Sequence, residues 1–289
     1  MDGTDQESKM GRGKPCTPAR PIASPPSTFV EVRISMGTAC DCIGPVQWEL
    51  ATDCPGWTVR GQLAHLIGIG RMLLGEAPPP PRAILPDHAR NGYAELNEPW
   101  VEARRRIPGN EPPAEFIFVT GRRIHELRTL ASEAFDVRSG SPVGELPYPD
   151  FLATRVFDCW AHAPDMRRVL GRPGGHNGEG EQTVLDRCER TMPEVVGKRV
   201  APPDGTTVRF VVTGVLGRQV KAVVADGRAE AVPADASGAT TTLIVAQEPF
   251  WRLGFDRVIP LRAVAAGQAK VIGDFALGHR VPGSMAFMN

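Results

Sequence analysis

The hydrophobic pattern of this 289-residue chain changes once, at the glycine-rich stretch GRPGGHNGEGE over residues 171–181. Before this stretch, apolar residues recur every three or four positions, as on the buried side of a helix. After it, they alternate with polar residues, as in strands with one buried face. The change predicts a two-domain α+β protein. A helical domain is expected over residues 29–175, and a small α+β domain with an antiparallel sheet over residues 182–289.

The first half predicts five helices, over about 29–50, 58–76, 89–106, 114–134 and 149–163. The second of these is the best defined, because Thr58 can cap its first turn and the prolines of APPPPR at 77–82 end it. His65 falls at the edge of its apolar arc. Arg60, Gly68 and Arg71 mark the side that we expect to be exposed.

The second half contains short runs in which β-branched and apolar residues alternate with polar ones. They predict strands within residues 206–214, 218–227, 240–246 and 268–274. Helices are expected over residues 182–198, 247–254 and 274–281. These helices can cover one face of the sheet.

Residues 1–28 are rich in proline, glycine, serine and charged residues and lack the apolar centre of a signal peptide. We therefore expect a disordered tail and a cytoplasmic protein. The 33 Lys and Arg residues balance the 33 Asp and Glu residues, which gives no general attraction to nucleic acid or to an anionic membrane. No apolar run approaches the roughly 20 residues that cross a bilayer.

The stretch DCWAHAPD at residues 158–165 raises the possibility of a metal site. Asp158 and His162 are four residues apart, so a helix places them on one face. A carboxylate and an imidazole there can supply two ligands to a divalent ion. The alternative is an ordinary polar face in contact with solvent.

Pro164 is expected to kink this helix just after His162, since proline lacks the backbone N–H that a helix uses. That kink makes Asp165 a doubtful ligand. A supporting role, or an ion pair with Arg167 or Arg168, is the better expectation for its carboxylate.

An open catalytic zinc site usually has three protein ligands, so one more is needed. The other histidines are His65, His88, His125, His176 and His279. His65 is the one placed beside a buried helix face, where a neutral imidazole needs a polar partner. A hydrogen-bonded core histidine would satisfy the same observation, so helical phase alone leaves the third ligand open.

Three stretches, taken in order, resemble the mycothiol-dependent maleylpyruvate isomerase family. They are DCPGWTVRGQLAHL at 53–66, DCWAHAPDMRRVLGRPG at 158–174 and GDFALGHRVPGSMAFM at 273–288. The resemblance implies a DinB-like four-helix bundle followed by a small, sterol-carrier-like α+β domain. It covers most of residues 30–289.

The resemblance also implies a divalent metal, with zinc preferred, bound by His65, Asp158 and His162. The isomerase has glutamate where this chain has Asp158, a side chain one methylene shorter, so the metal's identity stays open. The implied partners are mycothiol, as the thiol cofactor, and a small electrophile, with no nucleic acid or membrane. A monomer is compatible with it.

In this reading, a bound cation stabilises the thiolate, which adds to an activated double bond. Expulsion of the thiol gives a cis–trans isomerase, whereas retention gives an S-transferase. An acidic substrate needs a nearby cation, and we select Arg257 from Arg252, Arg257 and Arg262. Cys54 is interpreted as a buried small residue and not as a nucleophile.

Two other functions stay open at this stage. A metal-dependent hydrolase would keep the metal and dispense with mycothiol. A non-catalytic protein would hold a small apolar molecule in the second domain and use the bundle as a scaffold. Bound metal and dependence on a thiol distinguish the three.

Overall fold

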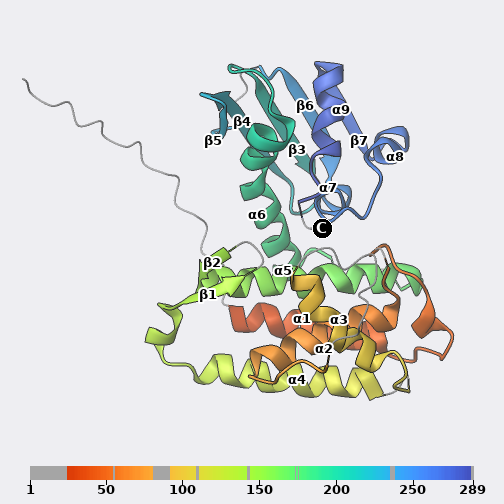
Figure 1. Ribbon diagram of the computed structural model, residues 1–289. Helices are drawn as coiled ribbons and strands as arrows, with labels where there is room; N and C mark the ends of the chain where they lie inside the picture. The colour runs from red at the N-terminus through yellow and green to blue at the C-terminus, as the bar shows by residue number, and fades with distance from the viewer. Residues whose placement is uncertain are drawn as a thin grey trace, which may run out of the picture.

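The computed structural model describes residues 25–54, 56–80, 92–108, 111–141, 144–172, 174, 176–234 and 238–287. Its helical half and its sheet lie one above the other, and α6 extends from the bundle to the sheet (Figure 1). This arrangement is a two-domain α+β fold, which confirms the predicted fold class.

Five long helices form the first half, and they are joined by short 3₁₀ turns and one hairpin. The helices are α1 (Pro25–Cys40), α2 (Val59–Leu73), α3 (Gly92–Arg104), α4 (Glu111–Thr129) and α5 (Tyr148–Val169). The 3₁₀ turns are η1 (Gln47–Glu49) and η2 (Ser132–Phe135), and the hairpin pairs β1 (Arg138–Ser141) with β2 (Gly144–Pro147). The sequence did not predict the hairpin. Thr58 caps α2 as predicted, its Oγ1 accepting from the Gly61 N–H at 3.2 Å.

Helix α1 differs from its prediction at both ends. It begins at Pro25, inside the segment expected to be a disordered tail, and it ends at Cys40. Thr28 is 1% exposed and its hydroxyl donates to Glu179 of the second half, so packing orders this part of the segment. Residues 1–24 lie outside the described part of the chain.

Helix α5 also differs, because Pro164 does not end it. The helix continues to Val169, and the residues on either side of the proline, Ala163 and Asp165, are both 1% exposed. Proline costs a helix one hydrogen bond. Burial of the surrounding turns offsets that loss here, so the predicted end of this helix at about Ala163 was wrong.

The second half holds a five-stranded sheet with helices against it. Its elements are α6 (Glu179–Glu194), η3 (Val195–Val200), β3 (Thr207–Thr213), β4 (Arg218–Ala225), β5 (Arg228–Val232), β6 (Thr241–Ala246), α7 (Gln247–Gly254), α8 (Pro260–Ala265), β7 (Ala269–Gly273) and α9 (Phe275–Gly283). The strand order is β5-β4-β3-β6-β7. Neighbouring strands are antiparallel except β3 and β6, which are parallel. Alternation identifies a strand's buried face but not its neighbour, so the sequence did not reveal this exception.

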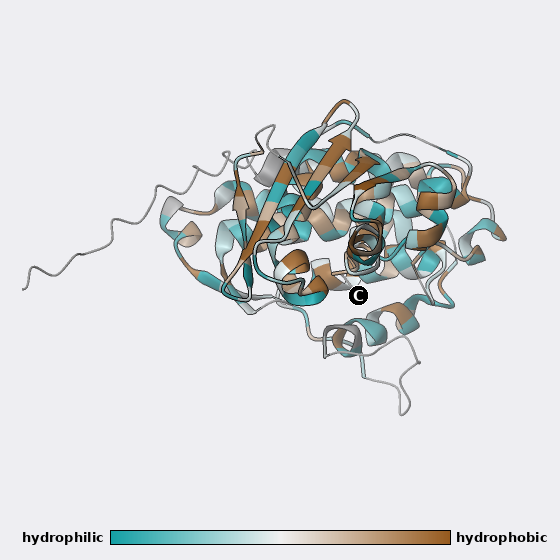
Figure 2. Cartoon of the chain, turned by 90° about the horizontal axis from the view of Figure 1, so that it is seen from above, coloured by the Kyte–Doolittle hydropathy of each residue, from teal (hydrophilic) through white to brown (hydrophobic). Residues whose placement is uncertain are grey.

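The sheet buries one face against the helices. On β3, Val208, Phe210 and Val212 are buried, whereas the residues between them are partly exposed. Figure 2 looks down on the molecule from above and shows hydrophobic segments along the strands. Strand β5 escaped prediction because its sequence, RAEAV, has no buried residue.

The glycine-rich stretch does not isolate the two halves, because their cores are continuous. The Phe157 ring of α5 stacks on Phe255, which follows α7, with ring centroids 4.4 Å apart. Trp160 of α5 meets Trp251 of α7 edge to face at 5.1 Å. Helix α5 therefore belongs to the packing of both halves.

Close packing of α2 against α3 depends on Gly68, which was expected to be exposed and is in fact buried. A methyl group on Gly68 would overlap Cβ of Trp100, whereas one on Gly37 of α1 would only touch Ile117 Cδ1, at 3.6 Å. We expect Gly68→Ala to lower the free energy of unfolding by roughly 1–3 kcal/mol through overpacking. Gly37→Ala should raise it by about 0.5–1 kcal/mol because alanine favours helix. Urea unfolding of both variants tests this, and similar effects of the two substitutions would contradict it.

Candidate metal centre

Helices α2 and α5 bring three possible metal ligands together. One ligand atom each from His65, Asp158 and His162 lies within 4.8 Å of the others. Oδ1 of Asp158 is 3.3 Å from His65 Nε2 and 3.6 Å from His162 Nε2. A tetrahedral ion bound at about 2.0–2.2 Å separates its ligand atoms by about 3.3–3.6 Å. The distances from Asp158 Oδ1 to the two imidazole nitrogens are thus those that a small divalent ion requires.

The cluster is inside the protein and not on a solvated helix face. His65 is 5% exposed and His162 is 4% exposed, and only the Asp158 side chain retains appreciable exposure, at 22%. The alternative interpretation of DCWAHAPD as a polar surface is therefore wrong. Helix α5 lies between the rest of the bundle and the second half of the chain (Figure 1), and its polar residues Thr154, Arg155, His162 and Asp165 are buried.

Burial and charge set the protonation states that metal binding needs. Burial lowers the pKa of His65, and the nearby Asp158 only partly opposes this shift. Burial works against ionisation of Asp158. However, the neighbouring His65, the Arg155 charge and the imidazole hydrogen bonds hold the pKa of that carboxyl well below its usual range. A neutral imidazole and an ionised carboxylate are the forms that ligate a metal.

Trp57 shields the two imidazoles. Its ring centroid is 4.8 Å from that of His65 and 5.7 Å from that of His162. Trp57 directly precedes Thr58, the cap of α2, so the start of this helix lies beside the candidate ligands. The Nδ1 atoms of both histidines are buried without a hydrogen-bond partner among the described residues. Their rings are oriented by packing and by Asp158.

Arg155 is a member of the cluster that our sequence analysis missed. Its guanidinium Nη1 donates to Asp158 Oδ2 at 2.5 Å, from one turn earlier in α5. The side chain is 11% exposed. The i, i+3 spacing of Arg155 and Asp158 was the available signal, since such residues are neighbours on a helix.

Asp165 connects this region to the second half of the chain. Its Oδ2 accepts from Arg257 Nε at 2.9 Å and from Gln62 Nε2 at 3.2 Å. The predicted ion pair thus exists, but with Arg257 in place of Arg167 or Arg168. Both partners are enclosed, with side-chain exposures of 1% for Asp165 and 8% for Arg257.

Cys54 is close enough to Arg257, Asp165 and Asp158 to feel their charges. Burial raises the pKa of its thiol to about 11, and Arg257 only partly offsets this effect. The thiol is protonated at neutral pH and is a weak nucleophile. This agrees with the prediction that Cys54 is not a nucleophile, although the residue is half-buried and not buried.

The remaining histidines do not join the cluster. His125 is exposed on α4, and His279 is half-buried on α9, where its ring bonds the carbonyl of Phe275. His176 lies 3.7 Å from the buried Glu181, whose hydrogen bond raises the pKa of the imidazole. His88 is outside the described residues.

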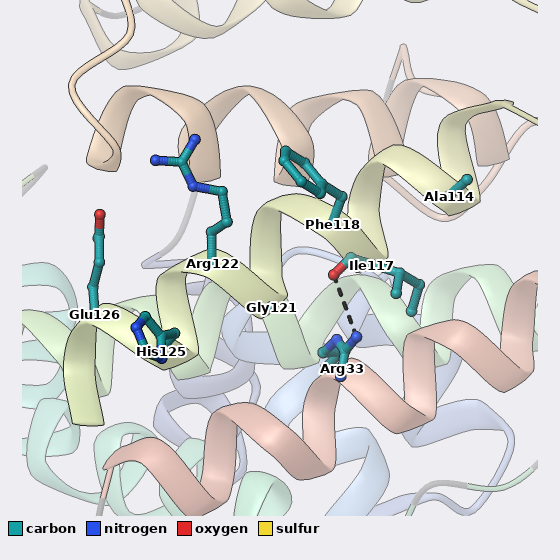
Figure 3. Close-up of a pocket in the computed structure, with 8 residues that line it drawn as sticks. All are labelled: Arg33, Ala114, Ile117, Phe118, Gly121, Arg122, His125 and Glu126. Carbon is teal, nitrogen blue, oxygen red and sulfur yellow. Dashed lines mark hydrogen bonds between the residues drawn. The ribbon is translucent and has the colours of Figure 1, made fainter. Parts of the chain in front are cut away.

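A surface groove of about 630 Å³ between α1 and α4 is separate from the three candidate ligands (Figure 3). It is lined by Arg33, Ala114, Ile117, Phe118, Gly121, Arg122, His125 and Glu126. None of the three candidate ligands contributes to it. Its size alone gives it no role in the chemistry of the cluster.

Comparisons with known proteins agree with this geometry. The profile of the mycothiol maleylpyruvate isomerase N-terminal domain matches residues 35–167, a range that includes all three candidate ligands. Residues 35–167 are thus similar to that domain, over a little under half of the chain. Among curated proteins, none matches the chain in sequence.

Two solved structures share the fold over most of the chain. A histidine-to-alanine mutant of the mycothiol-dependent maleylpyruvate isomerase is 11% identical, with a TM-score of 0.55, and the match covers 87% of this chain and 93% of that one. The isomerase structure without that mutation is 13% identical, with a TM-score of 0.52, and the match covers 83% of this chain and 90% of that one. At these identities the likeness establishes the fold, including the second domain. In the described part of the chain, no helix is both long and apolar enough to cross a membrane.

If the cluster binds a metal ion, removal of one ligand side chain should release the ion. We expect about one divalent ion per wild-type chain after purification without chelator and reconstitution with zinc, and much less for His162→Ala. His125→Ala removes an exposed histidine from α4 and should retain the ion. Elemental analysis of the three proteins is the measurement. Equal metal content in His162→Ala and wild type would refute the site.

Proposed function

We propose that this chain is a metal-dependent enzyme that uses mycothiol as its thiol cofactor. The proposal rests chiefly on one observation, the convergence of His65, Asp158 and His162 at ligand spacing inside a domain of the isomerase family. The family assignment agrees with the prediction of an enzyme. We infer zinc as the preferred ion, since two imidazoles and one carboxylate form a common catalytic zinc ligand set.

His65 and His162 would each contribute Nε2, and Asp158 would contribute Oδ1. A divalent metal held there supplies a Lewis acid that favours the thiolate form of a bound thiol. Trp57 and the walls of α2 and α5 exclude water from the two imidazoles. Three protein ligands leave a position for an exogenous group, as in open catalytic sites.

The reaction we propose is addition of the mycothiol thiolate to an activated cis double bond of a maleylpyruvate-type acid. The sulfur bonds to one alkene carbon, and the π electrons move to the conjugated carbonyl as an enolate. Rotation follows about the former carbon–carbon double bond, which is now single. Return of the electrons then expels the thiolate and leaves the trans isomer, with no net change in atoms. Protonation of the enolate and release of the thioether would instead make the enzyme an S-transferase.

Arg257 would bind a carboxylate of the substrate. The guanidinium is fixed by Asp165 and by the carbonyl of Phe255, which accepts from Nη1 at 2.8 Å. A guanidinium has five N–H donors, so these two bonds leave capacity for another anion. Arg252 supports the loop, since it bonds both the Arg257 carbonyl and Asp53 of the bundle.

The first experiment measures cis–trans isomerisation of maleylpyruvate, and thioether formation by mass spectrometry, with and without mycothiol. We expect activity only with both metal and mycothiol, and a loss of at least about 100-fold in His65→Ala. His125→Ala is the matched control and should retain wild-type activity. Bound metal with no thiol dependence would favour a hydrolase. Absence of metal after zinc reconstitution would favour a non-catalytic binding protein.

Arg257→Gln tests the substrate contact separately. We expect KM for an acidic electrophile to rise about 10–100-fold, because a charge-assisted hydrogen bond contributes roughly 1.5–3 kcal/mol. KM for a neutral electrophile should change little, and Arg257→Lys should recover part of the loss. Arg262→Gln, which removes an exposed arginine of the same domain, is the control. Equal loss of kcat on acidic and neutral electrophiles would show that Arg257 only supports the fold.

A further inference from the structure

We propose that Arg155 is a positioning residue. It holds one oxygen of Asp158 by a hydrogen bond and so leaves the other oxygen as the metal ligand. The inference deepens the proposed function and rests on it. It concerns a residue that neither the spacing of the ligands nor the comparisons single out. The argument comes from the contacts of the carboxylate, the burial of the guanidinium and the charge of the cluster.

The two oxygens of Asp158 have different surroundings. Oδ1 faces both imidazoles, at 3.3 Å from His65 Nε2 and 3.6 Å from His162 Nε2. Oδ2 also lies 3.3 Å from His65 Nε2, but it accepts the short hydrogen bond from Arg155. A carboxylate whose second oxygen is held this way can offer a metal one oxygen and not two. Arg155 thus favours a three-atom site of two nitrogens and one oxygen.

Arg155 has no other carboxylate to pair with among the described residues. It is 9% exposed, its Nη2 contacts only the Cys159 sulfur at 3.5 Å, and its Nε is buried without a partner. A buried guanidinium is costly unless it is paired with an opposite charge. Asp158 therefore serves two functions, as a ligand and as the counter-charge of Arg155. The helix fixes both, since the residues are one turn apart.

The charge of the cluster follows from this pairing. Two imidazoles ligate in the uncharged form, and the Asp158 and Arg155 charges of −1 and +1 cancel. The empty cluster is then neutral, and a divalent ion brings its full charge of +2 into the interior. Without Arg155, the carboxylate would lower the net charge of the metal-bound cluster to +1. Arg155 therefore weakens metal binding but leaves more positive charge to hold a thiolate and an anionic substrate.

Replacing Arg155 should make the site bind metal more tightly and change its geometry. We expect the Kd of metal-free Arg155→Gln for Co²⁺ and for Zn²⁺, each added alone and measured by chelator competition, to fall at least about tenfold. The visible spectrum of bound Co²⁺ should weaken, as it does when a second carboxylate oxygen raises the coordination number. Arg155→Lys keeps the charge and should bind within about threefold of wild type.

Arg167→Gln is the control, because it removes the same charge from the same helix. Arg167 donates to the Ser35 carbonyl and does not touch the cluster. Its Kd for Co²⁺ should match that of wild type. Arg155→Lys carries the test if Arg155→Gln does not fold, because tenfold tighter binding with the charge retained would refute the charge argument.

The outcomes separate this inference from the function on which it rests. A wild-type protein that binds neither Co²⁺ nor Zn²⁺ would refute the proposed function. Wild-type binding with an unchanged or weaker Kd and an unchanged Co²⁺ spectrum in Arg155→Gln would refute the role of Arg155 alone. Tighter binding with an altered spectrum in Arg155→Gln, and neither change in Arg167→Gln, would support it.

Discussion

The carboxylate of Asp158 is a negative charge inside the protein, and the arrangement of the bundle around it depends on its neutralisation. Such a group is expensive to bury unless opposite charge and hydrogen bonds surround it. Helix α2 supplies His65, and α5 supplies His162 and Arg155. These contacts fix how α2 and α5 face each other. The candidate metal site and the packing of the bundle are thus aspects of a single interaction.

Helix α5 also couples this interior charge to the second half of the chain. Its Phe157 and Trp160 rings pack against the residues in and after α7, while Asp165 pairs with Arg257 from the loop that follows. Three residues after Asp165, Arg168 forms ion pairs with Asp53 before α2 and with Glu248 in α7. The second domain therefore contributes groups beside the cluster and cannot be described as an appendage joined by a flexible linker.

The low identity to the solved isomerase structures separates what the fold needs from what the chemistry needs. At 11–13% identity, most aligned positions differ while the architecture persists. Cores tolerate such change if volume and patterning are kept. A metal site tolerates much less, because ligand type and distance are both restricted. The specific properties of this chain are accordingly expected in the cluster of Arg155, Asp158, His65 and His162.

The sequence by itself determined the fold class, the change from helices to strands, the Thr58 cap and the i, i+4 pair Asp158–His162. These are local properties, since they depend on periodicity and on residues within one or two turns of each other. His65 could be placed beside a buried face by helical phase, but phase does not specify which helix covers that face. Its selection came from the resemblance to a known family.

Only the tertiary structure decided the features that depend on residues far apart in the chain. Helix α5 continues through Pro164, and Gly68 is buried against Trp100. Strands β3 and β6 are parallel, and Asp165 pairs with Arg257. Each outcome is set by what packs against an element, which local propensity does not encode. The pairing of Arg155 with Asp158 was within local reach. Its consequence, a neutral cluster, became visible only when Arg155 and His65 were found to be buried on either side of the half-buried Asp158.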